Sequence, residues 1–93
     1  MSIAANKRAA RLFRKVAKDL TDIANDPALG MPDIKEMYLA DAKDHKQIAT
    51  LCDQHSPAKA CGEYLMMDTA SQDYFFEYLN EEQATWLDNY LEC

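Results

Sequence analysis

The stretch AARLFRKVAKDLTDIA, residues 9–24, decides the fold of this chain. Its apolar residues recur at intervals of three and four positions, which is the spacing of one buried face on an α-helix. That face consists of Ala9, Leu12, Phe13, Val16, Ala17, Leu20, Ile23 and Ala24. Because proline cannot continue a helix interior, we predict that this helix ends before Pro27.

Prolines also mark the next two helices. Residues 27–33 have turn residues at both ends and predict a loop. A second helix is expected from Pro32 to Asp53, with a break at the polar residues 41–44 as an alternative. Ser56 followed by Pro57 predicts the start of a third helix that ends near Met67. The expected core residues of these two helices are Ile34, Met37, Tyr38, Ala42, His45, Ile48, Ala49, Cys52, Tyr64, Leu65 and Met67.

The C-terminal third predicts two shorter helices. Residues 68–71 are expected to form a turn, and residues 74–79 a short fourth helix. Asn80 can cap a last helix, because Gln83 stands at the position that completes a capping box. Its expected inner side carries Trp86, Leu87, Tyr90 and Leu91.

These elements predict an all-α fold, a compact single-domain bundle of four or five helices over residues 1–93. The chain has only two glycines and three prolines, and β-branched residues are scarce, which favours helices over sheets. A chain of 93 residues can bury only a small core. Binding across a surface or groove is therefore easier for it than binding in a deep pocket.

Charge is sorted along the chain. The first 18 residues carry six positive charges and no negative ones, and no lysine or arginine follows Lys59. We call the six cations the basic stripe, since helical geometry places them within about 120° opposite the apolar face: Lys7, Arg8, Arg11, Arg14, Lys15 and Lys18. Folding does not need such sorting, but docking on a charged partner can use it.

The basic stripe has several interpretations. Cations at a helix N-terminus oppose the helix dipole, so the stripe is hard to explain as a device that stabilises the helix. Four interpretations remain. The stripe is a solvated face, or it contacts the acidic half of the same chain, or it forms a dimer contact, or it binds nucleic acid directly. The net charge of −6 disfavours the nucleic-acid alternative.

The C-terminal half combines acids with aromatic side chains. One interpretation places most of the aromatics in the core, with tyrosine hydroxyls reaching solvent. The other makes some of them anchors of a protein interface. Residues 74–90, which hold six of the nine aromatics, have no basic residues, so this segment suits a basic protein rather than nucleic acid. The candidate partner-binding residues are Asp73, Tyr74, Glu77, Tyr78, Glu81, Glu82, Trp86 and Asp88.

Metal and disulfide chemistry have weak signals. Cys52, His55 and Cys61 could be three zinc ligands, with His45 or Cys93 as the fourth, but the pattern lacks a CxxC pair. The favoured interpretation is two buried cysteines and a histidine that caps a helix end. A Cys52–Cys61 disulfide is a further alternative. We predict no metal and no cofactor.

The chain shows no strong catalytic pattern. His45 with Asp41 or Asp44 could form a general-base pair, but a histidine on an apolar helix face is more often part of a core. Its two glycines exclude a glycine-rich phosphate loop, since they lie at positions 30 and 62. We predict no catalytic residues and a protein that is not an enzyme.

These observations predict a small protein-binding module. No apolar run reaches the length of a membrane span, and three cysteines cannot all pair, which indicates a soluble protein of a bacterial or infected-cell cytosol. Its expected partner is a larger protein with a basic surface, such as a nucleic-acid-binding complex. By analogy of class, phage antagonists of host defence, of the anti-CRISPR or anti-restriction type, act in this way. The alternatives are a nucleic-acid-binding regulator that uses the basic stripe and a self-associating assembly protein, such as a homodimer.

Overall fold

The computed structural model describes residues 3–54, 57–67, 72 and 74–91, with the side chains of residues 75 and 76 left out. Within these ranges the chain forms α1 (Ile3–Ala24), the short 3-10 helix η1 (Pro27–Leu29), α2 (Pro32–Asp53), α3 (Pro57–Met66), α5 (Tyr74–Tyr78) and α6 (Glu81–Tyr90). The prediction of an all-α bundle of four or five helices is confirmed.

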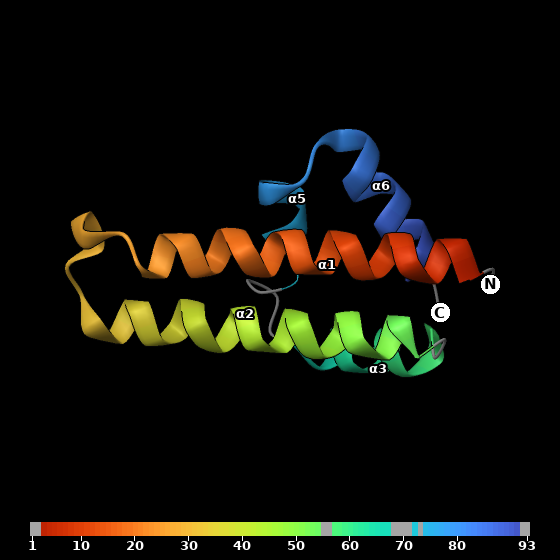
Figure 1. Cartoon of the computed structure of the whole chain (residues 1–93), viewed down its shortest axis with the longest axis horizontal. Coiled ribbons are helices and arrows are strands. Elements are labelled where there is room, and N and C mark those ends of the chain that lie inside the picture. The colour runs from red at the N-terminus through yellow and green to blue at the C-terminus, as the bar shows by residue number, and fades with distance from the viewer. Residues whose placement is uncertain (1–2, 55–56, 68–71, 73, 92–93) are drawn as a thin grey trace.

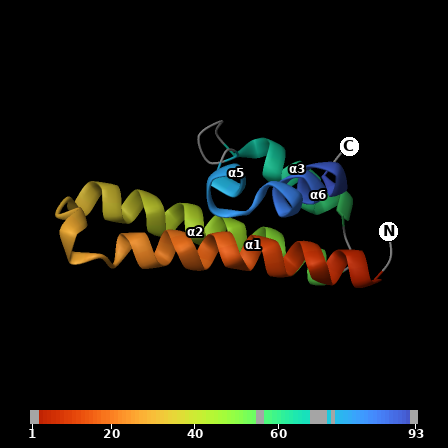
Figure 2. The same cartoon turned by 90° about the horizontal axis from the view of Figure 1, so that it is seen from above.

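A long antiparallel pair of helices organises the molecule. α1 and α2 lie side by side along an axis of 42 Å, while the other two extents are 23 and 20 Å (Figure 1). α3 packs on α2, whereas α5 and α6 pack on α1. Figure 2 shows α3, α5 and α6 gathered beside the half of the pair that carries the N-terminus. The opposite end, where η1 joins α1 to α2, projects beyond them.

The core lies where the helix pair meets the C-terminal helices. Phe13, Val16 and Leu20 of α1 are fully buried, as the spacing of residues 9–24 predicts. They pack in one cluster with Ile48 of α2 and Leu87 of α6. Burying such side chains supplies most of the driving force for folding, at about 1.5–3 kcal/mol for each.

α2 runs without a break through residues 41–44, so the alternative of an interrupted helix is wrong. Ala42 in the middle of this run is buried, and His45 one turn later is fully buried. The apolar stripe therefore continues through the polar run, where Lys43 and Asp44 are exposed and Asp41 is half-buried.

The start of α6 matches its sequence signal. The Gln83 backbone N–H donates to the Asn80 side-chain oxygen over 2.8 Å, and the Asn80 N–H donates to the Gln83 side-chain oxygen over 3.1 Å. This reciprocal pair is the predicted capping box. The expected cap at Ser56 and the expected turn at residues 68–71 lie outside the described residues.

Two expected core residues are exposed. Leu65 of α3 is 62% exposed and Met37 of α2 is 49% exposed. Met37 lies in the N-terminal part of α2, which follows η1, and Leu65 is not among the residues that α3 buries, which include Ala60 and Tyr64. Helical spacing indicated a plausible apolar face for both, but the neighbouring helices do not cover it.

Candidate functional site

The basic stripe of α1 is largely paired with other groups of the chain. The Arg14 guanidinium forms an ion pair with the Asp53 carboxylate at the C-terminal end of α2. The Lys15 ammonium group lies 2.9 Å from Asp19 and donates a hydrogen bond of 2.7 Å to the Tyr78 carbonyl oxygen. Two cations in the middle of the stripe are therefore used to join α1 to α2 and α5.

The remaining cations differ in their surroundings. Lys18 lies 2.8 Å from Asp22, and the hydrogen bond and charge of that carboxylate raise the pKa of Lys18. Lys7 and Arg11 are exposed, and no ion pair joins either to another described residue. Of the six cations, Lys7 and Arg11 are therefore the two that have no ion pair with a described residue.

Arg8 contacts the candidate partner-binding surface itself. Its guanidinium carbon lies 4.4 Å from the centroid of the Trp86 ring, which is cation–π geometry. A guanidinium nitrogen of Arg8 lies 3.7 Å from a carboxylate oxygen of Glu82. The Tyr90 ring is stacked on Trp86 with centroids 5.5 Å apart, so the indole is held by neighbours on α1 and α6.

Trp86 lies in an open groove on α6, which we call the Trp86 groove. Its volume is about 520 Å³, and its lining residues are Glu81, Glu82, Thr85, Trp86 and Asn89. Trp86 is partly buried, whereas Glu81 and Glu82 are exposed on the first turn of the helix. The structure therefore combines an aromatic wall with two carboxylates.

The other candidate residues do not all join this groove. Asp88 is exposed at a second opening beside α3, which Tyr64 and Leu65 also line. Glu77 is exposed on α5. Asp73 lies outside the described residues.

Tyr74 and Tyr78 act as part of the packing between α5 and the long helices. Both are partly buried against the core, with ring centroids 6.0 Å apart, and the Tyr74 ring lies 6.3 Å from that of Tyr38. Burial raises the pKa of the Tyr74 hydroxyl, and the nearby Asp41 carboxylate adds to this shift. Burial likewise raises the pKa of Tyr78. Of the predicted aromatic anchors, Trp86 is the one that lines the groove beside the two glutamates.

His45 belongs to the core. It is fully buried between Phe13 of α1 and Tyr74 of α5, with ring centroids 6.1 and 6.2 Å away. Its Nδ1 lies 2.7 Å from the Asp41 carbonyl oxygen, and its Nε2 has no hydrogen-bond partner among the described residues. Burial lowers the pKa of His45. The imidazole is out of reach of a substrate, so the general-base arrangement with Asp41 or Asp44 is not formed at an accessible site.

The two described cysteines are buried, as expected. Cys52 is a free thiol, so the alternative Cys52–Cys61 disulfide is not formed. Burial raises the pKa of the Cys52 thiol. The neighbouring Tyr90 hydroxyl donates a hydrogen bond of 2.8 Å to the Asn6 side-chain oxygen. Among the described residues no three His, Cys, Asp or Glu side chains are grouped as metal ligands. His55 and Cys93 lie outside those residues.

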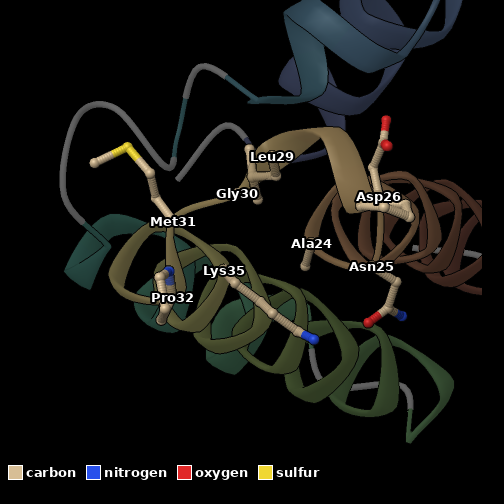
Figure 3. A pocket seen from close by; sticks show the side chains of 9 residues that line it. Ala24, Asn25, Asp26, Leu29, Gly30, Met31, Pro32 and Lys35 are labelled. Carbon is tan, nitrogen blue, oxygen red and sulfur yellow. The ribbon is translucent and has the colours of Figure 1, made fainter.

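Sequence reasoning did not anticipate a hollow at the projecting end of the helix pair. It has a volume of about 390 Å³ and extends from Ala24 to Lys35 around η1 (Figure 3). The Met31 side chain points away from the two helices, and the Asp26 carboxylate accepts a hydrogen bond from the Ala28 N–H. The signal was present only as turn residues, which predict a loop and not its shape.

Comparison of the chain with models of protein families, with curated proteins and with solved structures gives no match. Among the described residues, none of the helices combines the length and apolar character that crossing a bilayer requires.

Proposed function

We propose that this chain is a non-catalytic protein-binding module that docks its acidic α5–α6 surface on a basic surface of a larger protein. The observation that supports this best is the contrast between the two charged surfaces. Four of the six cations of the basic stripe form ion pairs within the chain, whereas Glu77 and Glu81 form no ion pair with another described residue. The acidic side therefore keeps more charge for a partner.

An inhibitory role follows from the kind of partner that this surface suits. A basic protein surface with room for an acidic helix is the kind of surface that binds phosphates of nucleic acid. A small protein seated there excludes the nucleic acid. We therefore propose that the chain inhibits or modulates a nucleic-acid-binding complex, as antagonists of the phage anti-defence class do.

Reversing the acidic side chains tests the docking surface. We expect the triple variant Glu77→Lys, Glu81→Lys, Glu82→Lys to lose capture of the partner from host lysate while it keeps its helical circular dichroism spectrum. The capture is performed with and without nuclease and read by mass spectrometry. A stoichiometric protein partner that survives nuclease treatment is the expected result for the unchanged chain.

A second triple variant controls for net charge. Glu36→Lys, Asp44→Lys, Glu63→Lys changes three exposed acids on α2 and α3. Each set adds six charge units, which takes the net charge from −6 to 0. Capture that survives the first set, or that is lost equally with both sets, contradicts docking through α5 and α6.

The nucleic-acid alternative rests on Lys7 and Arg11, the exposed cations of the stripe without a described acidic partner. Two phosphate contacts release few counterions, so we expect log K against log salt to have a slope of about −2 or shallower. Gel-shift titrations with duplex DNA and with RNA between low and physiological salt measure this slope. A slope steeper than about −4 would mean that the paired cations rearrange to bind phosphates, and would favour the alternative.

A further inference from the structure

We propose that the Trp86 groove recognises an arginine side chain of the partner, and that Arg8 occupies this arginine site within the free protein. This inference rests on the proposed function and names the chemistry of the partner's contact. The partner's guanidinium would take the place of Arg8 on the indole and pair with Glu81 and Glu82.

The contact that Arg8 makes shows what Trp86 and Glu82, two of the residues that line the groove, can bind. A single guanidinium lies over the Trp86 ring at 4.4 Å and within 3.7 Å of the Glu82 carboxylate. Arginine suits both contacts because its guanidinium is planar, stacks on aromatic faces and presents several N–H donors to a carboxylate. Lysine is a compact ammonium ion that remains more strongly hydrated and lacks the flat stacking surface.

The groove has more negative charge than Arg8 neutralises. Glu82 keeps 86% of its side chain exposed despite the contact with Arg8, and Glu81 has no ion pair with a described residue. Both acids line the same open volume of about 520 Å³ as Trp86. The charge complementarity therefore favours a cationic partner segment, and the aromatic wall favours arginine within that class.

The contacts of Arg8 with Trp86 and Glu82 are weak enough for a partner to displace it. Its side chain is 37% exposed, and cation–π contacts and ion pairs at exposed positions are weak. The stacked Tyr90 ring keeps the indole oriented when Arg8 moves away. Arg8 thus competes with the partner without closing the site, and its removal is expected to tighten arginine binding about threefold to tenfold.

The test uses the full chain and two peptides of equal charge, hexa-arginine and hexa-lysine, at about 20 mM salt, well below the screening of physiological salt. Trp86 is the single tryptophan of the chain, so its fluorescence reports binding at the groove. We expect hexa-arginine to change this fluorescence and to bind more tightly than hexa-lysine. The Arg8→Ala variant should bind hexa-arginine about threefold to tenfold more tightly than the unchanged chain.

Arg11→Ala is the matched control. It removes the same charge from the same face of α1, and Arg11, unlike Arg8, forms no cation–π contact with Trp86 and no ion pair with Glu82. Equal tightening by both variants, equal affinity for the two peptides, weaker binding by Arg8→Ala or no fluorescence change would each overturn the inference. Circular dichroism confirms that both variants are folded before they are compared.

The two proposals fail separately. A chain that loses its protein partner with the α5–α6 reversals but binds both peptides equally keeps the proposed function and loses the arginine site. A chain that prefers hexa-arginine but captures no protein from lysate keeps the arginine site and loses the proposed function.

Discussion

Replacing Leu20 by alanine is expected to lower the free energy of unfolding by about 2–5 kcal/mol. Leu20 is fully buried in the core cluster, on the same apolar face of α1 as Phe13 and Val16. The loss combines the transfer free energy of the removed methine and methyl groups with the cavity they leave. Urea unfolding followed by circular dichroism measures it. A small domain is stable by only about 5–15 kcal/mol, so the variant loses a large share of its stability.

Leu65→Ala is the matched control for Leu20→Ala, because it removes the same atoms from a position that is 62% exposed. We expect a change within about 0.5 kcal/mol, as for other surface substitutions. The comparison also tests the correction to the predicted core. Similar losses for the two variants would mean that Leu65 is covered in solution and that the exposed face of α3 has a partner.

Acid is expected to destabilise the protein through His45. Because burial lowers the pKa of His45, the unfolded chain binds a proton at a pH where the folded chain does not. The stability that the folded protein gains by keeping His45 neutral is complete above the ordinary histidine pKa of about 6.5. It is lost as the pH falls below that value. We expect the free energy of unfolding to fall by up to about 1.4 kcal/mol for each pH unit below 6.5.

The groups around His45 act in opposite directions on this titration. Burial among Phe13 and Tyr74 disfavours the imidazolium ion, whereas the Asp41 carbonyl and the carboxylates of Asp41 and Asp44 favour it. The direction of the pKa shift shows that burial dominates. Urea unfolding at a series of pH values from 7.5 to 5 measures the result, above the range in which most carboxylates titrate.

Two substitutions separate the contribution of His45 to the pH dependence of stability from that of other groups. His45→Phe should remove most of the pH dependence between 7 and 5, because phenylalanine fills the buried site without a titrating group. His55→Gln removes the other histidine and should leave the dependence in place. If the slope follows His55 instead, then His45 is not the buried neutral group that its surroundings indicate.

The helices were predictable because their signals are local. The apolar spacing of residues 9–24 gives α1, and Pro32 and Pro57 stand at the first positions of α2 and α3. Asn80 and Gln83 identify the start of α6 through hydrogen bonds that span three residues. Each of these signals depends on neighbours in the sequence and not on the arrangement of the bundle.

The exposure of Met37 and Leu65 was not predictable in the same way. A helical pattern identifies a candidate buried face, but burial also needs another helix beside that face. Met37 lies in the N-terminal part of α2 and is 49% exposed, although the neighbouring Tyr38 packs against Tyr74 of α5. That arrangement depends on long-range packing.

For the candidate site too, the sequence identified single residues but not the contacts between distant ones. Sequence reasoning selected Glu81, Glu82 and Trp86 as parts of a binding surface and Arg8 as part of a separate basic stripe. The structure joins these two sets through the contact of Arg8 with Trp86, which lie 78 positions apart in the chain. Because charge sorting alone does not show which cation meets which acid, only the fold could show that Arg8 contacts Trp86 and Glu82.

The projecting end of the α1–α2 pair divides the molecule into regions of unequal local stability. η1 buries none of its residues, whereas the stretch from Phe13 to Leu20 lies at the centre of the core. Segments with few buried apolar contacts open at a lower free energy than the whole protein unfolds. The backbone amides around η1 should therefore exchange their hydrogens with water through brief local openings. The backbone amides of the central core exchange only when the whole protein unfolds. One end of the protein can therefore change shape while the Trp86 groove at the other end stays intact.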